Sequence, residues 1–220
     1  MNPKPTLVIG NKNYSSWSLR PWLLLRRFGV DFDETKLPLD TPEFYARIIE
    51  YSPAGRVPVL IDGDVHVWDS LAICEYANEY FLEGRGWPAA RAARGWARAV
   101  SAEMHSGFAA LRTNMPMNVR KHVPTPALGA DTARDIARIR ALWNEARAHH
   151  AAQGPFLFGA FSIADAMYAP VALRFVSYSV EIGAVERAYV DTLLALPEMR
   201  EWLSEAQTEA LAPDHEKTAP

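Results

Sequence analysis

Cysteine is almost absent from this chain of 220 residues, since Cys74 is the only one. A single cysteine excludes a disulfide within the chain, so a reducing compartment is expected, with the cytoplasm as the default. The sequence also lacks any apolar run near the ~20 residues that cross a bilayer, and its polar start predicts no signal peptide. The histidines, among them His66, His149 and His150, form no ligand set, so no metal site is expected.

Blocks of basic charge are missing too. The formal net charge is −3, which argues against nucleic acid as the main partner. Apolar residues make up 49% of the chain and charged residues 22%, a composition typical of a packed protein rather than a disordered one. This length allows one large domain or two small ones.

The first part of the chain alternates strand and helix patterns. They predict a strand at 7–10, a helix at 19–28 that ends at Gly29, a strand at 30–39, a helix from 42 to about 50, a hairpin with its turn at Asp62-Gly63, and a helix from Ser70. This β-α-β-α-β-β-α order predicts an α/β domain over 1–83. A segment rich in helix breakers, 84–88, predicts a linker.

The remainder, 89–220, is predicted to be an all-helical domain. Helices are expected at 89–113, 131–152, 162–178, 184–194 and 197–210, followed by a frayed tail at 212–220. Ser162 and Asp165 have the spacing of a capping box, with Asp in place of Glu or Gln. Their expected role is in folding, not catalysis.

The most informative segment combines two residue pairs within 51–76. Val57-Pro58 opens an apolar strand with a residue that cannot donate to a sheet ladder. Asp69-Ser70 precedes a helix whose N-terminus can hold a carboxylate. The pairs predict a peptide-sized site with an anion pocket. Taken singly, they could be an edge-strand proline and a plain helix cap.

This strand–turn–strand–helix arrangement resembles the glutathione-binding domain of the cytosolic glutathione transferases, where a cis-proline and an acid–serine pair occur in the same order. The resemblance implies a thioredoxin-like first domain and an all-α second domain. It implies that the Val57 backbone beside Pro58 pairs with the cysteinyl part of glutathione, as an added strand does. Asp69 and Ser70 then hold the γ-glutamyl end. Arg56 either pairs with the glycyl carboxylate or is a solvated surface arginine.

The loop at 11–18 lies where these transferases place the Tyr, Ser or Cys that faces the sulfur of glutathione. Serine-type classes carry this serine six residues before an apolar helix position, and counting back from Pro21 gives Ser15. Ser16 is the rival, and Tyr14 a weaker one. A hydroxyl hydrogen bond stabilises a thiolate, whose free pKa is ~8.5. The alternative role for Ser15 is a helix N-cap.

The serine pattern of this loop, Ser-Ser-x-Ser, is most similar to the zeta class, the maleylacetoacetate isomerases. That class continues with Trp-Arg, whereas this chain has Leu-Arg. A thiol–disulfide reductase is disfavoured because the loop at 14–18 contains no cysteine.

The resemblance implies a serine-type glutathione transferase that conjugates glutathione, its co-substrate, to a small electrophile without a further cofactor. It also implies a homodimer. The alternatives are a zeta-type isomerase and a non-catalytic binding module. Candidates for the electrophile pocket are Met104, His105, Phe108 and Arg112, although core packing or a solvated helix face explains them equally well.

Overall fold

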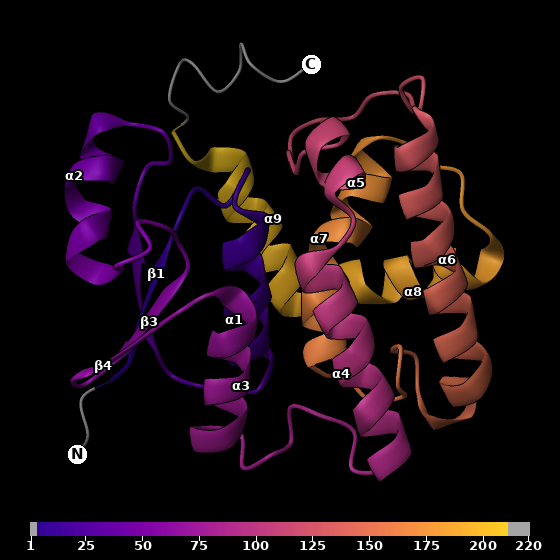
Figure 1. Cartoon of the computed structure of the whole chain (residues 1–220), viewed down its shortest axis with the longest axis horizontal. Helices are drawn as coiled ribbons and strands as arrows, with labels where there is room; N and C mark the ends of the chain where they lie inside the picture. The colour runs from indigo at the N-terminus through magenta and orange to yellow at the C-terminus, as the bar shows by residue number, and fades with distance from the viewer. Residues whose placement is uncertain (1–3, 211–220) are drawn as a thin grey trace.

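The computed structural model describes residues 4–210. A sheet with its helices forms one half of the molecule, and a bundle of helices forms the other (Figure 1). The expected order β-α-β-α-β-β-α is confirmed for the first half. The expected linker at 84–88 lies between α3 (Ser70–Tyr80) and α4 (Arg91–Ser106), where the chain passes from one half to the other. Within 4–210, none of the helices has the length and apolarity to cross a membrane.

Four short strands form the sheet in the order β2-β1-β3-β4. They are β1 (Thr6–Ile9), β2 (Asp33–Lys36), β3 (Val59–Asp62) and β4 (Val65–Trp68). β1 pairs with β2 in parallel and with β3 in antiparallel fashion, and β3 pairs with β4 as a hairpin. This mixed sheet has the thioredoxin-like arrangement that the sequence predicted.

Helices cover both faces of the sheet. Side chains alternate along a strand, so Leu7 and Ile9 enter the larger core while Val8 enters a smaller one. The smaller core is completed by Phe44 and Ile48 of α2 (Pro42–Tyr51). On the other face, α1 (Ser16–Arg27) packs against α3 and against α7 (Ile163–Ser177) of the helical half. α1 is therefore shared between the two halves.

Several element boundaries differ from those expected. α1 begins three residues earlier, because Ser15 caps it and polar Ser16 and Ser18 turn inward. The two-residue hairpin turn is Gly63-Asp64 rather than Asp62-Gly63, with Gly63 at φ 58°. The second strand covers only part of the alternating segment at 30–39.

The helical half contains α4, α5 (Ala109–Asn114), α6 (Ala130–His150), α7, α8 (Ala184–Leu194) and α9 (Pro197–Thr208), with a 3-10 turn at Ala151–Gln153. The single helix expected at 89–113 was wrong. It breaks at Gly107-Phe108, where Phe108 has φ 57°. The capping box is confirmed: Ser162 N–H and Oγ both contact Asp165 Oδ2, at 2.8 and 3.0 Å. The predicted fraying of 212–220 lies outside the described residues.

Candidate active site

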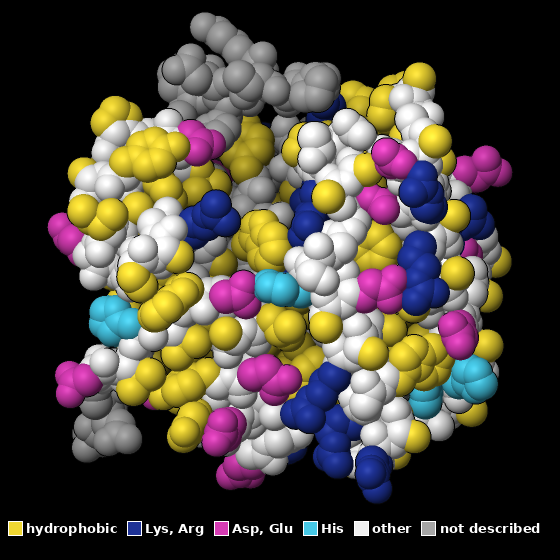
Figure 2. All heavy atoms as spheres, in the orientation of Figure 1, with side chains coloured by type: hydrophobic (Ala, Val, Ile, Leu, Met, Phe, Trp, Pro, Cys, Tyr) yellow, Lys and Arg dark blue, Asp and Glu magenta, His cyan; other side chains and the backbone are white. Residues whose placement is uncertain are grey.

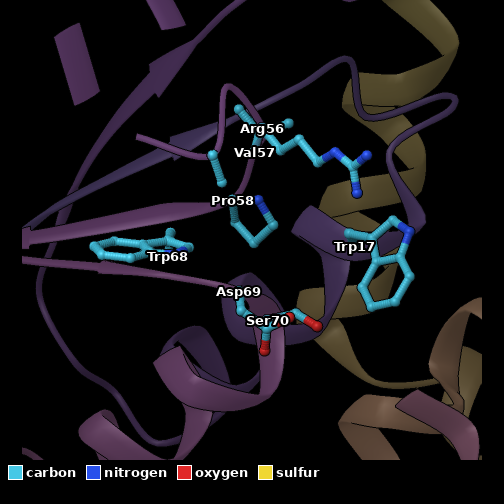
Figure 3. Close-up of a pocket in the computed structure, with 8 residues that line it drawn as sticks. Trp17, Arg56, Val57, Pro58, Trp68, Asp69 and Ser70 are labelled. Atoms are coloured by element: carbon cyan, nitrogen blue, oxygen red, sulfur yellow. The ribbon is translucent and has the colours of Figure 1, made fainter. Parts of the chain in front are cut away.

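A pocket of about 240 Å³ opens beside Pro58, at the start of β3. The Val57–Pro58 peptide is cis, as predicted. Figure 3 shows Pro58 between two indole rings, Trp68 on one side and Trp17 on the other. The pocket is lined by Trp17, Ala54, Arg56, Val57, Pro58, Trp68, Asp69 and Ser70. The two residue pairs that the sequence singled out therefore meet in one cavity.

Asp69 has the cap geometry that the sequence predicted. Its Oδ1 accepts the N–H groups of Leu71 and Ala72, at 2.9 and 3.1 Å, which fixes the N-terminus of α3. Its backbone has φ 81° and ψ 133°, a positive-φ conformation outside the left-handed helical region, which costs a residue other than glycine on the order of 1–3 kcal/mol. The second oxygen, Oδ2, lies 3.3 Å from His105 Nε2 in α4. The carboxylate therefore touches both halves of the molecule.

Ser15 and Ser16 are both buried, and neither lines this pocket. Ser15 is the N-cap of α1: its Oγ accepts Ser18 N–H at 3.4 Å and donates to Ser18 Oγ at 2.7 Å. Ser18 Oγ also accepts Gly10 N–H, at 3.2 Å. The helix-cap role is thus present in the structure. A contact of either serine with a sulfur stays a prediction.

Arg56 is exposed, in keeping with a solvated arginine. Its side chain lines the pocket and extends toward the indole of Trp17 (Figure 3).

Of the four candidates for an electrophile pocket, two lie near the site. Met104 and Phe108 belong to the hydrophobic core, which is the alternative role that their types suggested. His105 packs edge-on against Trp17 at 5.3 Å, and Arg112 lies 5.4 Å from the same ring. Arg112 Nη1 also donates to the His105 carbonyl, at 3.2 Å. Burial lowers the pKa of His105, although Asp69 opposes the shift.

Sequence reasoning missed Trp17, Trp68 and Arg20 as residues of this site. Arg20 Nη1 donates to Ser70 Oγ at 3.2 Å from within the core. One signal was available, because an arginine between Leu19 and Pro21 interrupts an otherwise apolar helix face. For Trp17 and Trp68, nothing in the sequence separates a pocket wall from ordinary packing.

The loop before α1 is fixed from the far end of the chain. Glu209, just after α9, accepts the backbone N–H groups of Lys12 and Asn13, at 3.0 and 2.7 Å. Arg120 donates to the carbonyls of Ala206 and Glu209. Arg120 is therefore part of this anchor.

Cys74 is buried, and burial raises the pKa of its thiol, as expected for an inert side chain. In the described part of the chain, no three His, Cys, Asp or Glu residues are grouped so that they could hold a metal ion.

Two family models match the chain. "Glutathione S-transferase, N-terminal domain" matches residues 14–79, and "Glutathione S-transferase, C-terminal domain" matches residues 129–205. Together these ranges cover more than half of the chain, and they lie on the two halves of the fold.

Curated relatives match over shorter stretches. A dichloromethane dehalogenase of Methylorubrum extorquens is 47% identical over 38 residues, which are 17% of this chain and 13% of that protein. A probable maleylacetoacetate isomerase of Caenorhabditis elegans is 33% identical over 108 residues, 49% of each chain. This chain therefore spans no more than about half the length of either relative.

Solved structures share the fold over nearly the whole chain. A glutathione transferase homolog from Burkholderia gl BGR1, with bound glutathione, has a TM-score of 0.73 at 21% identity and covers 94% of this chain and 100% of its own. A Tau class glutathione S-transferase from mango, Mangifera indica, has a TM-score of 0.72 at 15% identity and covers 100% of both chains. By its two family models and its fold, the chain belongs to the glutathione S-transferase family.

Proposed function

We propose that this protein binds glutathione in the pocket beside Pro58 and activates its thiol for attack on a small electrophile. The observation that carries the proposal is the meeting of Val57-Pro58 with Asp69-Ser70 in one cavity of a chain of this family. Glutathione is the co-substrate, and the chemistry requires no further cofactor.

The charges of the pocket match those of glutathione. Asp69 faces the γ-glutamyl ammonium, while Ser70 and the N-terminus of α3 face the γ-glutamyl carboxylate. The free backbone of Val57 pairs with the cysteinyl residue as an added strand. Arg56, which also lines the pocket, faces the glycyl carboxylate. This assignment supports a peptide ligand with an anion at each end.

The sulfur then lies toward the N-terminus of α1, with Ser15 as the proposed hydrogen-bond donor and Ser16 as its rival. Ser15 Oγ donates to Ser18 Oγ in this structure, at 2.7 Å. The hydroxyl must therefore turn from Ser18 to the sulfur when glutathione binds. A charged hydrogen bond and the helix dipole together can lower a thiol pKa by about two units, or roughly 2.7 kcal/mol.

We place the electrophile beside Trp17, whose ring is contacted by His105 and Arg112 from the helical half. The match to a maleylacetoacetate isomerase favours a second candidate, an isomerase that uses the thiolate of glutathione as a recycled nucleophile. A non-catalytic binding module is the third. The lone cysteine supports a reducing, cytoplasmic location, and we also propose a homodimer.

The serine-type mechanism is tested by titrating the thiolate absorbance of the glutathione complex. We expect Ser15→Ala to raise the pKa of bound glutathione and lower turnover with a chloronitroarene, with little change in glutathione affinity, because the hydroxyl favours the charged sulfur. Ser16→Ala is the matched control and leaves the titration unchanged.

Three other outcomes contradict parts of the proposal. A shift in Ser16→Ala alone moves the role to the neighbouring serine. No shift in either variant means that backbone amides or Tyr14 hold the sulfur. Glutathione binding without turnover of a chloronitroarene or of maleylacetone identifies a binding module instead of an enzyme.

A further inference from the structure

Arg20 places a positive charge in the protein interior directly behind the pocket. Only 1% of its surface is exposed. Its Nη1 donates to Ser70 Oγ at 3.2 Å, and its guanidinium carbon lies 4.3 Å from the centroid of the Trp17 ring. Ser70 and Trp17 both line the pocket, so Arg20 lies immediately behind its wall.

This buried charge has no carboxylate partner. Among residues 4–210, none of the ion pairs involves Arg20, and its Nε is buried without a hydrogen-bond acceptor. The carboxylate of Asp69 contacts His105 Nε2 instead, at 3.3 Å. A buried charge without a partner destabilises the folded protein. A ligand that brings an anion close to this charge would offset that destabilisation.

Neighbouring charges increase the imbalance. Burial lowers the pKa of Arg20 to about 9, and the positive charges of Arg174 and Arg112 add to the shift. At neutral pH the side chain still carries its charge. The interior behind the pocket therefore favours an anion and disfavours a cation.

The direction of the Arg20–Ser70 hydrogen bond identifies where that anion binds. Ser70 Oγ accepts from Arg20, so the hydroxyl proton remains available to donate to a group in the pocket. The N-terminus of α3, which begins at Ser70, favours negative charge at the same place. Asp69 beside it favours an ammonium. A carboxylate over Ser70 with an ammonium near Asp69 is the charge pattern of an α-amino acid group.

We propose that Arg20 is a positioning residue for the γ-glutamyl carboxylate of glutathione. It holds the Ser70 hydroxyl as a donor toward the pocket and supplies the opposite charge behind it. The inference rests on the proposed function, and it adds to the site a residue from α1 that acts through Ser70.

Two analogues of glutathione test which charge Arg20 serves. 4-Aminobutyryl-Cys-Gly lacks the γ-glutamyl carboxylate, whereas glutaryl-Cys-Gly lacks the ammonium. Dissociation constants of all three peptides are measured by calorimetry for wild type, Arg20→Gln, Arg20→Lys and Arg27→Gln. Arg27 is the matched control, an exposed arginine on the same helix that pairs with Glu198 away from the pocket.

Wild type is expected to bind 4-aminobutyryl-Cys-Gly about ten- to a hundredfold more weakly than glutathione. In Arg20→Gln, 4-aminobutyryl-Cys-Gly should bind less than about threefold more weakly than glutathione. The difference in affinity between glutaryl-Cys-Gly and glutathione should be the same as in wild type, because Asp69 is intact. Arg20→Lys keeps the positive charge but loses the planar guanidinium and its N–H donors. We therefore expect it to discriminate against 4-aminobutyryl-Cys-Gly more than Arg20→Gln and less than wild type. Arg27→Gln should discriminate among the three peptides as wild type does.

A structural role makes a different prediction. If Arg20 only holds the fold, Arg20→Met lowers the melting temperature, whereas removal of an unpaired buried charge leaves it equal or higher. The inference is wrong if Arg20→Gln discriminates between glutathione and 4-aminobutyryl-Cys-Gly as strongly as wild type does. If Arg20→Gln does not fold, the same result in Arg20→Lys shows that the inference is wrong.

The proposed function is wrong if wild type binds no glutathione at millimolar concentration. If wild type binds glutathione and 4-aminobutyryl-Cys-Gly equally well, this inference is wrong and the proposed function still stands.

Discussion

At the residue scale, the two oxygens of the Asp69 carboxylate contact α3 and the helical half, respectively. Oδ1 caps the helix, and Oδ2 contacts His105. Asn is also a good N-cap and tolerates positive φ, so Asp69→Asn removes the charge while the helix start is preserved. The substitution therefore separates the two roles.

We expect Asp69→Asn to raise the KM for glutathione about ten- to a hundredfold, because one charged hydrogen bond is worth roughly 1.5–3 kcal/mol. The melting temperature should change little. Ser70→Ala should weaken glutathione binding in the same way. Steady-state kinetics and thermal melts measure both effects. Unchanged glutathione affinity in both folded variants would reduce the pair to a helix cap.

At the scale of elements, α7 depends on the capping box at its start. The Asp165 carboxylate accepts Leu157 N–H and Ser162 N–H in the buried interior, at 3.0 and 2.8 Å. Burial raises the pKa of Asp165 from 3.8 to about 6. The folded protein therefore binds this proton more tightly than the unfolded chain. The stability that this group contributes is fully present below about pH 4 and is lost as pH rises to about 6.

Asp165→Asn should lower the free energy of unfolding by about 1–3 kcal/mol at pH 7, because the amide nitrogen that replaces one carboxylate oxygen cannot accept the hydrogen bond made there. The fall in stability between pH 4 and pH 6 should also be shallower than in wild type. Urea titrations at several pH values measure both. Asp131→Asn, at an exposed ion pair with Arg134, is the control and should stay within about 0.5 kcal/mol. Equal pH slopes in wild type and Asp165→Asn would contradict the assignment.

The anchor between α9 and the loop before α1 also belongs to this scale. Lys12 Nζ lies 4.7 and 5.3 Å from the ring centroids of Trp22 and Trp202, which pack edge-on against each other, and it forms ion pairs with Glu34 and Glu205, at 2.9 and 2.7 Å. Together with the contacts of Glu209, this joins the loop that carries Ser15 to the end of the helical half.

At the scale of the whole molecule, large apolar side chains are exposed on the sheet half. They lie on α2, β4 and α3, the part where hydrophobic side chains gather on the left of Figure 2. The exposed residues are Tyr45, Ile49, Val65, Trp68 and Tyr80. An exposed apolar surface of this kind is typical of a protein–protein contact, and it supports the proposed homodimer.

We expect the protein to be a dimer at micromolar concentration, as measured by light scattering after gel filtration. Ile49→Asp, at a residue 71% exposed, should shift it toward monomer because a charge is disfavoured in an apolar interface. Val185→Asp, on the 48% exposed Val185 of α8 in the other half, is the control and should leave the dimer intact. A monomeric wild type, or loss of the dimer in both variants, would contradict this location of the interface.

The sequence by itself determined the order of elements and the two pairs that build the pocket. These features depend on local chemistry. The hairpin depends on a two-residue turn with Gly63, and the starts of the helices depend on caps such as Asp69 and Ser162. The start of β3 depends on Pro58. Local patterns fixed boundaries less well. Gly107 is a local sign of the break between α4 and α5, but it did not fix the boundary, because the left-handed residue there is Phe108, which packing stabilises.

Only the tertiary structure decided what surrounds those pairs. Arg20 meets Ser70 across 50 positions of sequence, and Glu209 meets Asn13 across 196. Whether a buried polar group is satisfied depends on partners brought together by folding, and these separations carry no periodic signal. The sequence therefore predicted a glutathione-binding site at Pro58 and Asp69. The buried charge of Arg20 behind Ser70 follows only from the packing of α1 against α3.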